Sequence, residues 1–166
     1  MHSPTRLSPT ARHWHAIYLN LAHGWNTCAS LWSFPWPRQW FGWYGFNAGS
    51  ELDVDAITAQ AFINTDVAAS FAAITWLAIE WSLVKKPKFV GLLTGAVAGL
   101  ATITPAAGYV SLSSAVTIGI AAGGVCYLAV HLKNKMGWDD ALDVWGVHGI
   151  GGCLGTICWA CLHRRL

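Results

Sequence analysis

The chain has 166 residues, of which 54% are hydrophobic and only 11% are charged, and its formal net charge is +2. Soluble domains carry about 25% charged residues, so this composition excludes an ordinary soluble domain and indicates a membrane protein. The small net charge and the short basic clusters also argue against a nucleic-acid partner.

Residues 1–38 give no sign of a membrane helix. They contain Arg6, Arg12 and Arg38 but no acidic residue, and they hold four of the six prolines. Their apolar runs are too short for the core of a signal peptide. We therefore expect residues 1–38 to be an irregular N-terminal segment.

Residues 39–50 (QWFGWYGFNAGS) are uncharged and rich in aromatic residues and glycine. A helix rises ~1.5 Å per residue, so this stretch covers only part of a hydrocarbon core about 30 Å thick. Helical spacing puts Trp43, Phe46 and Ser50 on one face. The other face is suited to close helix packing and carries Gly42, Gly45 and Gly49.

The aromatic face of residues 39–50 has two interpretations. It is typical of the tryptophan-tyrosine belt at a membrane interface. It also suits a cation, because ring faces attract cations and the hydroxyl of Ser50 can accept a hydrogen bond from an N–H donor.

Longer apolar runs follow, and they predict four full spans. The first is Ala56–Val84, whose centre is uncharged although it carries two acidic residues. Residues 89–130 contain no charged residue and are long enough for two crossings of about 20 residues each. Residues 105–114 (PAAGYVSLSS) supply the turn between these crossings. Residues 144–162 form the last span.

Lysines between the spans predict the orientation of the chain, because short basic loops favour the cytoplasm. One cluster follows the first full span and another follows the third; the residues are Lys85, Lys86, Lys88, Lys133 and Lys135. An even number of crossings separates the clusters, so both loops can be cytoplasmic. The acidic residues between 51 and 55 then face outward.

The segment DDALDVWGVHGIGG, residues 139–152, combines acidic residues with a histidine inside a span. Asp139, Asp140 and Asp143 suit the N-terminus of a helix electrostatically. His148 is a functional candidate, because an ionisable group inside a membrane span is costly. Its glycine neighbours leave room for a backbone or a narrow lumen, and a neutral imidazole can pass on a proton or bind a small N–H donor.

The C-terminal segment CWACLH, residues 158–163, comes close to the haem-attachment pattern C-x-x-C-H, but Leu162 separates the second cysteine from the histidine. We therefore expect no cofactor and no metal site. The serines lie at the ends of the spans, far from His148, so we expect no catalytic residues and no enzyme activity.

Four motifs in this order resemble the ammonium transporter (Amt/Mep/Rh) family: WFGWYGFNAGS, AFINT, GLLTGAVAGLATITPAAGYV and DDALDVWGVHGIGG. The resemblance covers residues 39–158 and implies an all-α polytopic membrane protein, here a partial helical bundle that corresponds to the second half of the fold. It implies transport of ammonium or ammonia across the plasma (cell inner) membrane by a multi-pass homotrimer in the lipid bilayer.

The resemblance also implies roles for individual residues. Ser50 would help to form the outer ammonium-recruiting site, Phe46 would be one of two stacked gating phenylalanines, and Trp43 would line the channel beneath them. His148 would be one of twin pore histidines. We expect Thr104 to have a structural role in ending a span.

The chain departs from the family in several ways. Family members are more than twice as long and build the pore between two pseudo-symmetric halves, whereas residues 1–38 hold no counterpart of the first half. Asp66 belongs to no family motif and needs a partner. Residues 159–166 do not look native to the family. We expect a fragment from a truncated or frameshifted gene that does not transport alone; the alternative is a non-transporting helical module that associates with transporter subunits.

Overall fold

A computed structural model describes residues 35–162 of the chain. The chain divides into two units, Met1–Gln39 and Trp40–Leu166, and of the first unit only the opening of one helix is described. Residues 1–34 and 163–166, which make up most of the segment predicted to be irregular and half of the C-terminal end, lie outside the described residues. A helix nevertheless begins at Pro35, inside that N-terminal segment.

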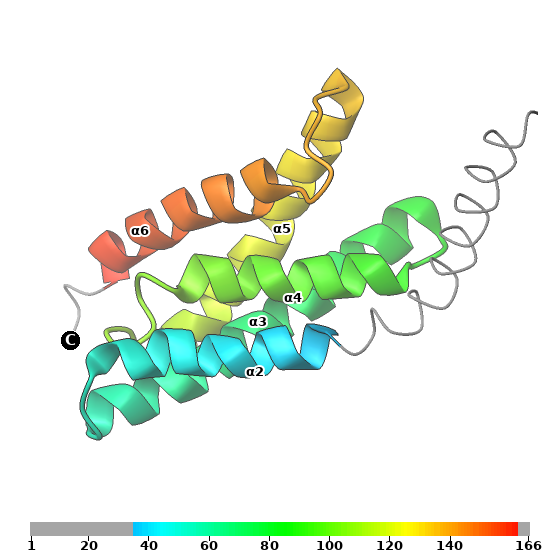
Figure 1. Cartoon of the computed structure of the whole chain (residues 1–166). Helices are drawn as coiled ribbons and strands as arrows, with labels where there is room; N and C mark the ends of the chain where they lie inside the picture. Colours follow the sequence, from blue (N-terminus) through cyan, green and yellow to red (C-terminus); the bar gives the residue numbers. More distant parts are fainter. Residues whose placement is uncertain (1–34, 163–166) are drawn as a thin grey trace, which may run out of the picture. The chain divides into compact units, whose positions relative to one another are not determined.

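Every regular element of the described part is helical, which confirms the predicted all-α class (Figure 1). The elements in chain order are α2 (Pro35–Ala48), the 3₁₀ turn η1 (Gly49–Glu51), α3 (Ala56–Val84), α4 (Phe89–Ile103), α5 (Leu112–Met136), the π-helical turn η2 (Trp145–Ile150) and α6 (Gly151–Leu162). The bounds of α3 are those predicted for the first full span.

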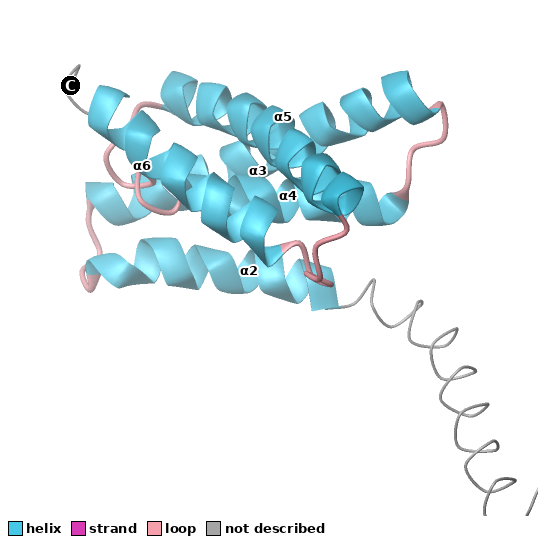
Figure 2. Ribbon diagram, turned by 90° about the horizontal axis from the view of Figure 1, so that it is seen from above, coloured by secondary structure: helices cyan, strands magenta, loops and turns pink. Residues whose placement is uncertain are grey.

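Successive helices reverse direction within the second unit. In Figure 1, α3 runs toward the right and α4 returns to the left, and α5 leads away again before α6 returns. Figure 2 shows the same reversals from above. The loop before α3 therefore lies at the opposite end of α3 from the loop that holds Lys85, as the predicted topology requires.

Three described helices are long and apolar enough to cross a membrane: Ala56–Val84, Leu112–Met136 and the continuous stretch Trp145–Leu162. The segment predicted as the second full span, α4, is shorter, with 15 residues, and covers about 22 Å. The helix ends just before the predicted turn, because Pro105 has no N–H to continue the hydrogen-bond ladder. The chain instead forms turns in which Ala106 N donates to Ile103 O at 2.8 Å and Tyr109 N donates to Ala106 O at 2.9 Å.

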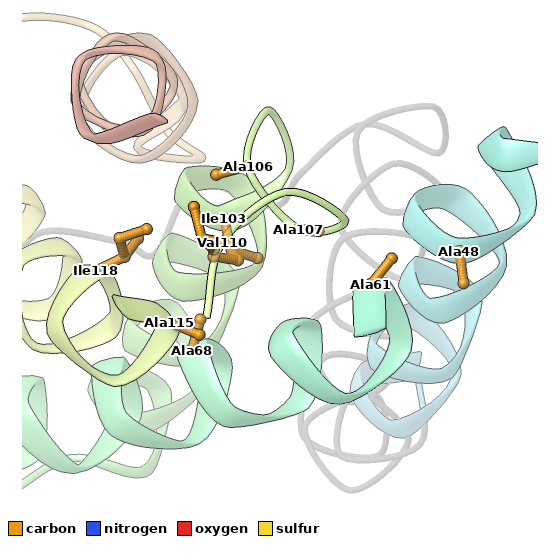
Figure 3. Close-up of a cluster of buried hydrophobic side chains, with 9 residues drawn as sticks. All are labelled: Ala48, Ala61, Ala68, Ile103, Ala106, Ala107, Val110, Ala115 and Ile118. Carbon is orange, nitrogen blue, oxygen red and sulfur yellow. The ribbon is translucent and has the colours of Figure 1, made fainter. Parts of the chain in front are cut away.

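Small residues bring α3, α4 and α5 into backbone contact. A Cβ added at Gly119 would lie 2.6 Å from the carbonyl oxygen of Ala68, and one added at Gly123 would lie 2.6 Å from that of Ala72. A real side chain would therefore force these helices apart. The buried cluster beside these contacts is composed mostly of alanines from α2, α3, α5 and the loop after α4 (Figure 3).

The glycine face of α2, predicted to suit close helix packing, meets no other described helix. A Cβ added at Gly42, Gly45 or Gly49 would meet nothing within 4 Å among the described residues. These glycines therefore do not pack against α3 to α6, and the packing of α2 depends on its polar and aromatic side chains.

Candidate functional site

Trp43, Phe46 and Ser50 lie along the end of α2 and in the turn that follows it. The rings of Trp43 and Phe46 meet edge to face, with centroids 6.0 Å apart and planes at 72°. The hydroxyl of Ser50 donates to the backbone carbonyl of Phe46, which leaves its oxygen lone pairs as acceptors. The Phe46 side chain is 60% exposed, so this aromatic face is open in the described part of the chain.

His148 lies in the π-helical turn η2, far from α2 in the sequence. Its imidazole stacks on the indole of Trp43, with ring centroids 6.0 Å apart and planes at 19°. Phe46, Trp43 and His148 therefore form a continuous series of ring contacts across two helical elements. The structure brings these three predicted residues together, and it places Ser50 beside Phe46.

Thr104 connects this series of rings to α4. The indole N–H of Trp43 donates to the hydroxyl oxygen of Thr104 at 3.0 Å. The Thr104 hydroxyl in turn donates to the carbonyl of Leu100 at 2.8 Å. Thr104 was expected only to end a span, because nothing in the spacing of the motifs indicates that it meets Trp43.

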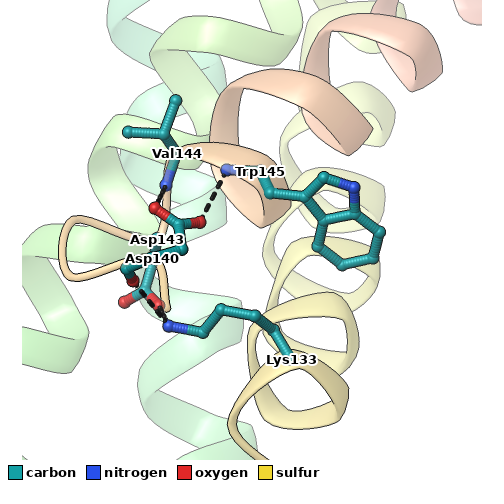
Figure 4. Close-up of polar contacts among 5 residues, drawn as sticks. All are labelled: Lys133, Asp140, Asp143, Val144 and Trp145. Carbon is teal, nitrogen blue, oxygen red and sulfur yellow. Dashed lines mark hydrogen bonds and ion pairs between the residues drawn. The ribbon is translucent and has the colours of Figure 1, made fainter. Parts of the chain in front are cut away.

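The segment before His148 is held by Asp140 and by Lys133 (Figure 4). One carboxylate oxygen of Asp140 accepts the N–H of Val144 at 3.0 Å and the other accepts that of Trp145 at 2.8 Å. A carboxylate at the first N–H groups of a helix is favoured by the unsatisfied donors and by the dipole. The expectation that an acidic residue caps this helix is therefore confirmed for Asp140.

Lys133 was predicted to lie in a basic loop, and this prediction is wrong. The helix α5 continues to Met136, and the side chain of Lys133 is buried with only 6% of its surface exposed. Its ammonium group lies 2.6 Å from Asp143 Oδ1 and donates to the carbonyl of Asp140 at 2.7 Å. Lys133 thus neutralises a loop carboxylate as well as contributing charge at this end of the bundle.

The sequence of the chain matches a known family over most of its length. The sequence model of the Ammonium Transporter Family matches residues 39–165. The chain belongs to this family. The match extends past Cys158 and includes most of the end that was predicted not to look native.

Several ammonium transporters are similar to the chain. It is 51% identical over 119 residues to an ammonium transporter of Bacillus subtilis, covering 71% of this chain and 30% of the relative. It is 52% identical over 119 residues to one of Aquifex aeolicus, covering 71% of this chain and 28% of the relative. The chain spans about 30% of the length of the B. subtilis relative.

Solved structures give the same fold. The crystal structure of Mep2 from Saccharomyces cerevisiae matches with a TM-score of 0.69 at 42% identity, covering 72% of this chain and 28% of Mep2. The family and the three long apolar helices make this chain a membrane protein with the helical architecture of ammonium transporters.

Asp66 acquires the partner that its position in a span requires. The hydroxyl of Tyr44 donates to Asp66 Oδ1 at 2.5 Å, and the Tyr44 ring stacks on Phe62 with centroids 4.2 Å apart. Tyr44 was not predicted as this partner, although a carboxylate inside a span implies a nearby donor. Tyr44 and Asp66 therefore help to hold α2 against α3, in place of the glycine contacts that were predicted.

Within residues 35–162 no group of three or more His, Cys, Asp or Glu side chains is arranged to hold a metal. The histidine of the CWACLH segment, His163, lies outside the described residues. The site in the described part is therefore composed of aromatic rings, one imidazole and hydroxyl groups.

Proposed function

We propose that the face formed by Phe46, Trp43 and His148 is one side of a path for ammonium or ammonia through the membrane. The observation that carries this proposal is the series of ring contacts from Phe46 through Trp43 to His148. An imidazole inside a membrane protein marks a candidate substrate pathway. Here the imidazole is exposed, and so is the ring of Phe46, which contacts the same indole.

Each residue of the path has a distinct role in this proposal. The Ser50 oxygen accepts an N–H of ammonium outside the path, and the aromatic faces beside it attract the cation. The ring of Phe46 gates the entrance, and Trp43 lines the lumen. The neutral imidazole of His148 then binds the deprotonated cargo in surroundings that hold little water.

The proposal includes the setting of the whole transporter. The protein lies in the plasma membrane as a multi-pass protein in contact with lipid, and it acts as a homotrimer. The remainder of the family fold completes the path on the side that Phe46 and His148 leave open. The function is movement of cargo, with no bond made or broken apart from the transfer of a proton.

A graft tests the proposal. Residues 39–158 replace the matching segment of the B. subtilis ammonium transporter, which is 51% identical over 119 residues, in cells without other ammonium transporters. We expect the graft to restore growth on low ammonium and uptake of labelled ammonium. A graft that reaches the membrane in normal amount and carries no ammonium contradicts the proposal.

The 166-residue chain expressed alone is the matched comparison. We expect it not to restore growth, because the imidazole of His148 then faces lipid without the rest of the path. Failure of both the graft and the single chain, with both proteins present in the membrane, favours the alternative of a non-transporting helical module.

A further inference from the structure

We propose that Thr104 is a positioning residue whose hydroxyl fixes the Trp43 indole in the orientation that stacks on His148. The inference rests on the proposed function, since it gives the Trp43–His148 pair a third member that the family motifs did not assign. The contacts of the Thr104 hydroxyl are with the Trp43 indole and the Leu100 carbonyl. It acts only through the indole.

The Thr104 hydroxyl donates one hydrogen bond and accepts another. A threonine hydroxyl has one hydrogen and two lone pairs. Its hydrogen is directed to the carbonyl of Leu100 at 2.8 Å, so a lone pair remains for the indole N–H, which lies at 3.0 Å. An indole nitrogen can only donate. The three groups therefore form a chain with a single polarity, from the Trp43 N–H through Thr104 to the backbone of α4.

Thr104 lies at a restricted point of the backbone. It directly follows α4 as its C-terminal cap and precedes Pro105, which fixes the local backbone. The acceptor oxygen is therefore held rigidly by the backbone on one side and by its own bond to Leu100 on the other. A tryptophan bound at its N–H to such a point loses the freedom to rotate about its side-chain torsions.

Both ring contacts of Trp43 depend on the orientation of its indole. The indole plane is within 19° of the imidazole plane, while Phe46 meets the same indole edge to face at 72°. Rotation of the indole would break both arrangements together. The hydroxyl of Thr104 thus controls the orientation of the surface against which His148 lies.

Isosteric substitution separates this role from a role in packing. Thr104→Val keeps the shape and removes the hydroxyl, whereas Thr104→Ser keeps the hydroxyl and removes the methyl group. Thr94→Val is a matched control on the same helix, because Thr94 also donates to the carbonyl four residues earlier, at 2.9 Å from Val90 O. Thr94→Val removes a bond from a threonine hydroxyl to a helix carbonyl and leaves the bond between Trp43 and Thr104 in place.

The test uses the 166-residue chain in lipid nanodiscs, labelled with ¹⁵N at the indole and ¹³C at the histidine ring. Trp43→Phe and His148→Gln assign the two resonances. In Thr104→Val we expect the Trp43 indole proton to move upfield as its hydrogen bond is lost. We expect the His148 ring protons to move downfield, because they leave the shielding region above the indole. Thr104→Ser and Thr94→Val should leave both resonances in place.

Three results overturn the inference: an unmoved indole proton in Thr104→Val, a moved indole proton with unmoved His148 resonances, or equal shifts in Thr94→Val. If Thr104→Val does not fold, benzothienylalanine at position 43 replaces the indole N–H by sulfur and leaves Thr104 intact. The same shift of the His148 resonances is then expected, and its absence overturns the inference.

The transport graft distinguishes this inference from the proposed function. If His148→Ala leaves ammonium uptake unchanged while the resonances move as expected, the proposed function fails and the positioning role stands. If His148→Ala abolishes uptake and Thr104→Val changes neither uptake nor the resonances, the positioning role fails alone. Reduced uptake in Thr104→Val that Thr104→Ser restores supports both.

Discussion

Lys133 and Asp143 form an ion pair of 2.6 Å that joins the last turn of α5 to the loop leading into the His148 segment. The same ammonium group holds the carbonyl of Asp140, whose carboxylate binds the first N–H groups of the next helical segment. The position of η2 therefore depends on one buried cation. A charge at the end of α5 therefore helps to determine where His148 lies.

Replacing Lys133 by methionine should destabilise the protein. The substitution leaves the Asp143 carboxylate without its cation, and removing one partner of a buried ion pair costs about 3–5 kcal/mol. We expect the lower end of that range, because 26% of the Asp143 side chain is exposed. Unfolding of the purified chain in mixed micelles by increasing SDS measures the effect. Lys135→Met, at an exposed position of the same helix, is the control and should change stability by less than about 0.5 kcal/mol.

A second substitution tests the cause of that destabilisation. Lys133→Met combined with Asp143→Asn removes both charges, so it should recover part of the lost stability. A double variant that is less stable than Lys133→Met would contradict the ion-pair explanation.

Gly155→Ala should weaken the packing of α6 on α4. A Cβ at Gly155 would collide with the backbone carbonyl oxygen of Thr102, and it would lie 3.0 Å from a ring carbon of Pro105. Overpacking costs about 1–3 kcal/mol, which exceeds the gain of about 1 kcal/mol in helix propensity. Gly152→Ala on the same helix meets nothing within 4 Å and should be neutral or stabilising. Equal stability of the two variants would show that α4 and α6 are not in contact there.

The topology follows from the lysines and from the alternating direction of the helices. We expect the loop with Lys85, Lys86 and Lys88 to be cytoplasmic and the acidic residues around Asp53 to be external. In a variant whose native cysteines are replaced, Asp53→Cys should react with an impermeant maleimide in intact cells, and Lys86→Cys should react only after lysis. The opposite labelling pattern would reverse the orientation.

Ser50→Ala and His148→Ala should differ in the transport graft. The first removes one exposed hydrogen bond of about 0.5–1.5 kcal/mol, so recruitment of ammonium should weaken mildly. The second leaves the cargo without the hydrogen bond to the imidazole, which costs about 1–3 kcal/mol. Uptake should therefore fall roughly five-fold or more, or lose its discrimination against other cations. Concentration-dependent uptake, with potassium as competitor, measures both. Unchanged rate and selectivity in His148→Ala, with uptake abolished by Ser50→Ala, would leave the histidine only a packing role.

The apolar runs and their breaks predicted the helices well, because bilayer thickness limits the length of a span. The bounds of α3 and the turn at Pro105 could be predicted in this way. The end of α4 at Ile103 follows from the same turn. The continuation of α5 through Lys133 was missed because a lysine within a helix was taken for a loop.

The candidate site was predictable within one helix and not between helices. Helical spacing placed Trp43 and Phe46 on one face, and their rings do meet. The stacking of Trp43 on His148, its bond to Thr104 and the bond between Tyr44 and Asp66 depend on how separate helices approach one another. Small residues determine how closely two helices approach. Their spacing in the sequence indicates that a helix packs closely, but it does not indicate which helix it packs against. The roles of Ser50, Phe46, Trp43 and His148 in transport stay predictions.

The π-helical turn at Trp145–Ile150 makes the face that His148 presents sensitive to chain length. A π turn holds one residue more than an α turn between bonded groups, so it acts as a one-residue insertion in an otherwise regular helix. Deleting a single residue there would restore a regular α-helix in which the segments on either side keep their register, so that only the residues of the turn itself change direction. The imidazole would then leave the indole of Trp43, although every side chain named in the path would still be present.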